Sequence, residues 1–95
     1  MFLKFSENAQ EDLAYNLERL QDGLMPLDSR PLNTIGPGVF ELRTKDKGIQ
    51  YRVVYIRMEV GIVVLHCFTK KTQQTPQHEI DTARQRLKRV KEEMR

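Results

Sequence analysis

The chain has 95 residues and a mass of 11.2 kDa, which is enough for one domain, residues 1–95, and excludes a large cofactor-binding fold. Its 39% hydrophobic and 31% charged residues are typical of a globular domain with a polar surface and exclude a disordered chain. The net charge is only +3, and the longest apolar run, Gly61–Leu65, is far shorter than the roughly 20 residues of a membrane span.

The N-terminal part predicts a short strand followed by a helix. Phe2–Phe5 alternates weakly between apolar and polar residues, as a strand does, and is not the start of a signal peptide. Ser6–Asn8 then predicts a helix start, with Asn8 and Glu11 at capping-box spacing and Gly23 as the stop. The apolar residues of this segment recur every three or four positions, which predicts one buried face: Ala9, Leu13, Leu17, Leu20 and Leu24.

The middle of the chain predicts a connecting segment and an antiparallel meander. Residues 25–38 are rich in proline and glycine, and we expect one helical turn after Ser29-Arg30-Pro31. Three strands follow, at 39–44, 49–57 and 60–69, separated by turns at 45–48 and 58–59. The strand at 60–69 is the most apolar, which predicts a central place in the sheet.

A polar loop over 70–77 leads to a basic C-terminal helix. Its apolar residues form one stripe: Ile80, Ala83, Leu87, Val90 and Met94. Most of its basic residues, such as Arg84 and Arg86, lie off that stripe. The predicted order is strand, helix, three-stranded meander, helix, which is a small α+β domain with an antiparallel sheet.

The charge is unevenly distributed along the chain. Residues 1–40 carry three basic and six acidic side chains, whereas residues 41–95 carry thirteen and seven. A basic second half suggests a polyanionic partner. The alternative is that these side chains only solvate the C-terminal helix.

The usual catalytic motifs are scarce. The sequence has no glycine-rich phosphate loop, no cluster with metal-ligand spacing and only two histidines, so it predicts neither a metal nor another cofactor. The one cysteine, Cys67, excludes an internal disulfide and lies in the most apolar strand, where a buried inert thiol is expected. A reduced, cytoplasmic setting is the simplest interpretation.

Cations on the predicted strands are the remaining signal. With an even-numbered hairpin loop, Glu41 and Arg43 share a face with Arg52, and arginines held by strands suit phosphate contacts. The alternative is a structural ion pair between Arg52 and Glu41. On the last strand His66, Phe68 and Lys70 share a face and lead to Lys71, a set suited to stacking a base and holding its phosphate. Alternatively, Phe68 is a core residue and His66 is a histidine whose hydrogen bonds are satisfied within the fold.

Three stretches together resemble the RelE/HigB toxin superfamily, and most closely its phage-derived HigB-like branch. They are Val39–Arg43, Gln50–Tyr55 and Leu65–Pro76, the last with an F-x-K-K-T-x-x-T-P pattern before a basic helix. The resemblance covers about residues 3–92, and the predicted element order agrees with it. It implies a RelE-like, microbial-RNase-type fold and a toxin that cleaves messenger RNA on the ribosome, without a metal, by attack of the ribose 2′-hydroxyl on the adjacent phosphate.

The resemblance also implies roles for residues. Arg52 matches the arginine that stabilises the charged phosphorane, while Lys70 and Lys71 match the basic pair that ends the last strand. Arg43 matches a basic residue on the first meander strand. The acidic, histidine or tyrosine cluster of some members is absent, so the identity of the general base stays open. His66 is one candidate, because an unperturbed imidazole titrates near neutral pH. A lysine could serve only if neighbouring cations lowered its pKa. We also assign RNA contacts to three other residues: Phe68, Tyr55 and Arg84.

The implied partners are the ribosome, messenger RNA and a cognate antitoxin of helix-turn-helix type, with operator DNA bound only through the antitoxin complex. Two alternatives stay open: a gyrase-inhibiting toxin of the same fold, and an inactive co-repressor. Retention of the four cations argues against the gyrase inhibitor, whose relatives generally lack them.

Overall fold

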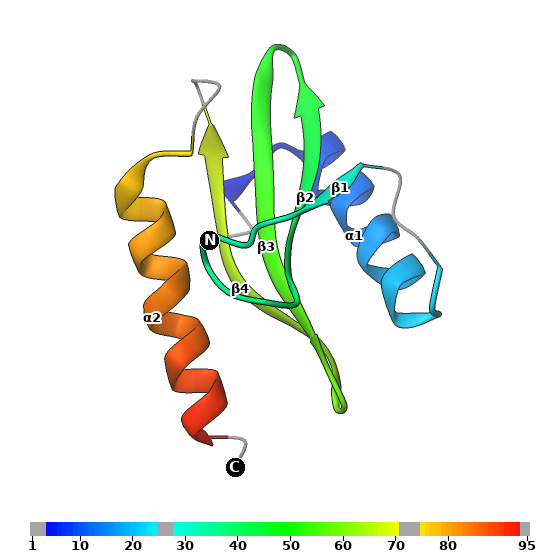
Figure 1. Cartoon of the computed structure of the whole chain (residues 1–95). Coiled ribbons are helices and arrows are strands. Elements are labelled where there is room, and N and C mark those ends of the chain that lie inside the picture. The colour runs from blue at the N-terminus through cyan, green and yellow to red at the C-terminus, as the bar shows by residue number, and fades with distance from the viewer. Residues whose placement is uncertain (1–3, 25–27, 71–74, 94–95) are drawn as a thin grey trace.

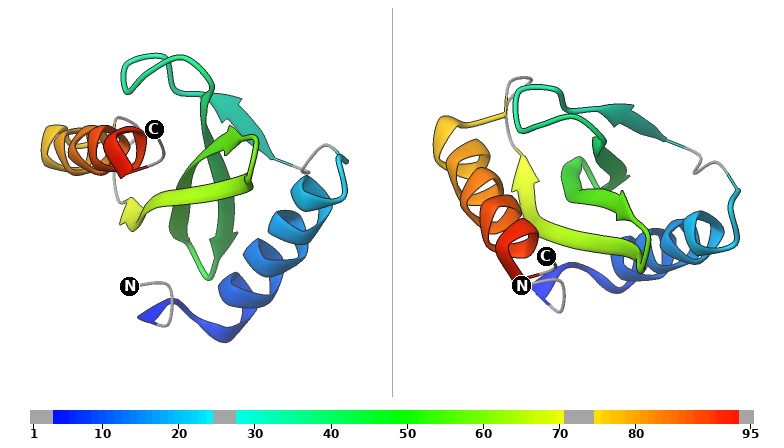
Figure 2. Two further views of the ribbon diagram at one scale, coloured as in Figure 1. Left: turned by 90° about the horizontal axis from the view of Figure 1, so that it is seen from below. Right: turned by 60° about the horizontal axis from the view of Figure 1, so that its bottom comes forward.

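The computed structural model describes residues 4–24, 28–70 and 75–93 (Figure 1). Its elements are, in chain order, α1 (Glu7–Gln21), β1 (Ser29–Pro31), β2 (Val39–Asp46), β3 (Ile49–Met58), β4 (Gly61–Lys70) and α2 (Gln77–Glu93). The strands form one antiparallel sheet in the order β1-β2-β3-β4. The two helices lie on opposite sides of this sheet (Figure 2). The predicted α+β class is confirmed.

Helix α1 is fixed at both ends by its own sequence. Ser6, not Asn8, is the N-cap, because its hydroxyl accepts a hydrogen bond from Ala9 N. Gly23 has φ +80°, and the amides of Gly23 and Leu24 donate to Leu20 and Arg19 carbonyls, which is a Schellman motif at the predicted stop. The predicted buried face is confirmed at Ala9, Leu13 and Leu20, whereas Leu24 is exposed.

The strand outside the meander is not at the N-terminus, where the sequence predicts it. Residues 2 and 3 of the expected first strand lie outside the described residues, and Lys4 and Phe5 are not in a strand. Instead Ser29–Pro31 pairs with β2 at the edge of the sheet, where proline's missing amide is tolerated. The expected turn follows it, with Leu32 O accepting from the amides of Ile35 and Gly36.

The β2–β3 hairpin has the predicted parity. Its loop is only Lys47-Gly48, whose φ values of 51° and 81° are those of a type I′ turn. Every cross-strand pair therefore joins an odd-numbered to an even-numbered residue, and Glu41, Arg43 and Arg52 share one face.

Strand β4 lies at the edge of the sheet, so its predicted central position is wrong. Its apolar side chains are nevertheless buried, because Cys67 packs in the α1-side core and Leu65 and Phe68 in the α2-side core. The register slips between the pairs Val54–His66 and Tyr55–Val64, which leaves Leu65 as a β-bulge.

The two cores use the two faces of the sheet. Alternate residues of β2 and β3 face α1 (Leu42, Tyr51, Val53, Tyr55) or α2 (Val39, Val54, Ile56). The predicted stripe of α2 is confirmed from Ile80 to Val90, while Met94 lies outside the described residues. Within the described residues, neither helix is long and apolar enough to cross a membrane.

Candidate functional site

Three cations from three neighbouring strands lie on one face of the sheet. Arg43 of β2 is directly opposite Arg52 of β3, and Lys70 of β4 is opposite Gln50, two residues from Arg52. We call Arg43, Arg52 and Lys70 the cation row. Residue parity is constant along the hairpin, so the cation row lies on the same face as the apolar residues that pack towards α2. The row is closer to the Lys47-Gly48 turn than those apolar residues are.

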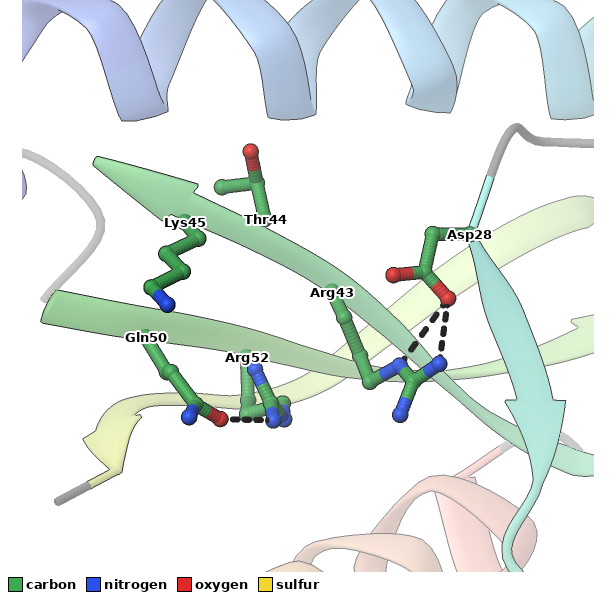
Figure 3. Close-up of a pocket in the computed structure, with 6 residues that line it drawn as sticks. All are labelled: Asp28, Arg43, Thr44, Lys45, Gln50 and Arg52. Carbon is green, nitrogen blue, oxygen red and sulfur yellow. Dashed lines mark hydrogen bonds and ion pairs between the residues drawn. The ribbon is translucent and has the colours of Figure 1, made fainter. Parts of the chain in front are cut away.

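An open depression of about 210 Å³ lies beside the two arginines (Figure 3). Its lining residues come from β2, β3 and the residue before β1: Asp28, Arg43, Thr44, Lys45, Gln50 and Arg52. Three of the six are cationic at neutral pH, and one is anionic. Such a lining is suited to an anion such as a phosphate diester.

Arg52 is a buried cation with contacts to three neighbouring residues. Its Nε lies 2.5 Å from Glu41 Oε1, while Nη1 donates to Tyr51 O at 3.2 Å and Nη2 to Gln50 Oε1 at 2.5 Å. The residue is only 6% exposed. Burial, and to a smaller extent Arg43, lower the pKa of Arg52, whereas Glu41 raises it. The ion pair with Glu41 that the sequence left as an alternative is therefore present, and it fixes the guanidinium in place.

Arg43 is paired differently. Its Nη2 and Nε donate to Asp28 Oδ1 at 2.6 and 3.0 Å (Figure 3). The two side chains are 25% and 52% exposed, so this pair is at the surface. Nothing in the local sequence marks Asp28 as a site residue, because its partner Arg43 is fifteen positions away.

Lys70 is buried beside the arginines, with 8% of the residue exposed. Burial lowers the pKa of Lys70, and Arg52 and Arg43 act in the same direction, against the opposing effect of Glu41. This is the environment in which a lysine can give up its proton closer to neutral pH. Lys71, predicted to act with it, lies outside the described residues.

Residues 1–88 match the family described as "Phage derived protein Gp49-like". The chain belongs to that family. No curated protein and no solved structure matches it. The match covers the whole cation row and most of α2, so the site is part of the Gp49-like domain.

His66 of this Gp49-like domain has both ring nitrogens engaged. Nδ1 lies 2.9 Å from Arg86 Nη1, and because arginine only donates, Nδ1 is the acceptor. Nε2 therefore carries the hydrogen and donates to Glu79 Oε1, also at 2.9 Å. Arg86 Nη1 additionally donates to Leu65 O at the bulge. The histidine thus links β4 to α2, as the satisfied-histidine alternative predicts.

Of the three other predicted RNA-contact residues, Phe68 adjoins the cation row, directly opposite Arg52 in the sheet, whereas Tyr55 and Arg84 contact other parts of the fold. Phe68 is 6% exposed and stacks on His66, with ring centroids 5.4 Å apart, so it is a core residue. Tyr55 faces α1 on the opposite side of the sheet, where its hydroxyl is 2.9 Å from Ser29 Oγ. Arg84 donates to Thr34 O and fastens the loop before β2 to α2.

The remaining groups that could carry chemistry are metal ligands and the thiol of Cys67. Among the described residues, no three His, Cys, Asp or Glu side chains lie close enough together to hold a metal ion. Cys67 is 6% exposed, so it is buried as the sequence predicts, and burial raises the pKa of its thiol, which makes the reactive thiolate less accessible.

Proposed function

We propose that this protein is the toxin of a type II toxin–antitoxin system and cleaves messenger RNA on the ribosome. The observation that carries the proposal is the cation row, in which the sheet register places Arg43, Arg52 and Lys70 side by side. Each of the three residues lies in one of the stretches that resemble the RelE/HigB superfamily. Membership of a phage-derived family is compatible with it.

The chemistry follows from the environments of the cations. Attack of a ribose 2′-hydroxyl on the neighbouring phosphorus gives a phosphorane that carries extra negative charge. Arg52, held by Glu41 and Gln50, is a preorganised cation for that charge, and Arg43 is suited to an adjacent phosphate. Lys70, with its lowered pKa, is our candidate for the proton transfer, and Lys71 is expected to assist it.

His66 fits this proton transfer less well than Lys70. Its two nitrogens are engaged with Glu79 and Arg86, so it would first have to break a link between β4 and α2. We therefore assign His66 a structural role and transfer the catalytic role to Lys70.

The ribosome supplies what the protein lacks. The depression beside the arginines is small and open, so it does not by itself hold a nucleotide in the in-line geometry. A ribosome-bound messenger RNA is already ordered, and a few fixed cations are then enough. A cognate antitoxin would inhibit the toxin in the cytoplasm, and only their complex would bind operator DNA.

The test is primer extension on messenger RNA after induction of the toxin. We expect discrete, codon-phased cuts with the natural protein and with Lys88→Met, which neutralises an exposed lysine of α2. Lys70→Met, which neutralises the buried lysine with a side chain of similar size, should give no cuts while remaining folded. Intact messenger RNA with arrested DNA replication would instead identify a gyrase inhibitor, and unaffected growth a co-repressor.

A further inference from the structure

Asp28 occupies one of the two edges of Arg43 that a phosphate can use. One carboxylate oxygen accepts from both Nε and Nη2, at 3.0 and 2.6 Å, and these two N–H groups form one of the two edges by which a guanidinium binds a phosphate in a bidentate manner. Asp28 also lines the depression that contains Arg52 and Gln50. A polyanion that approaches the cation row therefore finds the guanidinium of Arg43 already bound to the carboxylate of Asp28.

The two carboxylates of the site differ in how easily they can leave. Glu41 and Arg52 are 4% and 7% exposed at their side chains, so separating them would leave an uncompensated buried charge. Asp28 is 52% exposed, so its carboxylate can turn into water at little cost. Arg52 is thus permanently paired, whereas the partner of Arg43 is exchangeable.

The backbone allows this exchange without unfolding the sheet. The amide of Arg43 donates to the carbonyl of Asp28 at 3.0 Å, and the next residue, Ser29, pairs with Leu42. These contacts use main-chain atoms only. Rotation of the Asp28 side chain is sufficient to free the guanidinium, and β1 stays in place.

We propose that Asp28 is an internal competitor of the RNA backbone at Arg43, so that a phosphate binds the Nε/Nη2 edge only by displacing the carboxylate. The identification of the anion as an RNA phosphate rests on the proposed function. In the free protein the contact removes one cation from the site and weakens the binding of loose single strands. RNA that is already ordered on the ribosome presents its phosphate at high effective concentration and displaces Asp28.

The experiment measures binding without cleavage. The probe is a short, fluorescently labelled single-stranded RNA with 2′-O-methyl groups throughout, which has no attacking hydroxyl, and its anisotropy is titrated with protein in the absence of ribosomes. We expect Asp28→Asn to bind about three- to tenfold more tightly than the natural protein, because the competing charge is removed. Asp28→Ala, which also removes the acceptor oxygen, should gain at least as much.

Two controls separate local competition from net charge. Glu59→Gln makes the same change in net charge in the β3–β4 turn, and it should alter affinity far less than Asp28→Asn. In an Arg43→Gln background, Asp28→Asn should give no gain, since the group competed for is gone. A gain that persists there, an equal gain with Glu59→Gln, or no gain at all would each overturn the proposal.

The outcome is independent of the primer-extension test. If Asp28→Asn gains affinity through Arg43 but no messenger RNA is cut, Asp28 still competes with an anion and only the endonuclease assignment fails. If messenger RNA is cut and Asp28→Asn gains nothing, the endonuclease stands and the internal competitor is wrong.

Discussion

Arg43 and Arg52 lie directly opposite each other on β2 and β3, and each is paired with a carboxylate of its own. Like charges in opposite positions destabilise a sheet, so the two carboxylates offset a local cost of assembling the site. The pairs differ in depth, since Arg52–Glu41 is buried and Arg43–Asp28 is exposed.

This difference predicts unequal effects on stability. Glu41→Gln leaves the buried Arg52 charge without its counter-charge and should lower the free energy of unfolding by about 3 kcal/mol. Asp28→Asn breaks an exposed pair and should lower it by less than about 1 kcal/mol. Urea unfolding of both variants, with similar slopes, measures the difference. Equal losses would contradict the burial that the structure assigns to the two pairs.

Lys70 should make stability depend on pH. Its folded pKa is lowered, mainly by burial, below the ordinary value of 10.5, so between the two values the unfolded chain binds more protons than the folded one. The contribution of this residue to stability is therefore unfavourable at neutral pH and is relieved as pH rises towards about 10.5. Lys70→Met should be more stable than the natural protein at pH 7, and its advantage should shrink with rising pH.

The quantity to follow with pH is the difference in free energy of unfolding between Lys70→Met and the natural protein. Burial raises the pKa of Cys67 above its ordinary 9.0, so the thiol gives the opposite slope in the same alkaline range. That slope is common to both proteins and cancels in the difference. A stability difference that does not change with pH would show that Lys70 titrates normally in the folded state.

The two histidines offer a matched pair of substitutions, because both approach Glu79 Oε1. His66 Nε2 is 2.9 Å from it and 9% exposed at the side chain, whereas His78 Nε2 is 3.6 Å away and 79% exposed. His66→Ala should lower the free energy of unfolding by about 2–3 kcal/mol, since Arg86 and Glu79 lose a buried partner. His78→Ala should change it by less than about 0.5 kcal/mol.

Amide hydrogen exchange shows which part of the fold is loosened by His66→Ala. The amides of α2 should exchange faster in His66→Ala, because the link from β4 to that helix is lost. A folded His66→Ala protein with normal exchange in α2 and no cleavage of messenger RNA would instead restore His66 as an acid or base.

Local sequence was sufficient for the parts of the fold that depend on periodicity. The stripes of both helices and the parity of the β2–β3 hairpin follow from spacing alone, and with them the shared face of Glu41, Arg43 and Arg52. Ser29–Pro31 is too short to show a period and contains proline, so nothing local marks it as a strand. The composition of β4 does not reveal its edge position. A helix packs on each face of the sheet, so an edge strand there is as apolar as a central one.

The site was only half predictable for a related reason. Cations on adjacent strands follow from the register, but their partners come from tertiary contacts. Asp28 reaches Arg43 through the pairing of β1 with β2, and His66 meets Arg86 only after α2 packs on the sheet. Tyr55 and Arg52 lie on opposite faces for a local reason, because residues three apart in one strand point to opposite sides of the sheet.

The Lys47-Gly48 turn should be improvable, because Lys47 has φ +51° without being glycine. The left-handed conformation costs a lysine roughly 1 kcal/mol, and asparagine adopts it more readily, particularly before glycine in a type I′ turn. Lys47→Asn should therefore raise the free energy of unfolding by about 0.5–1 kcal/mol, measured by urea unfolding. Lys45→Asn, two residues earlier in β2, is the control for charge and should give no gain. A stabilisation of equal size in Lys45→Asn would show that charge, and not turn geometry, is responsible.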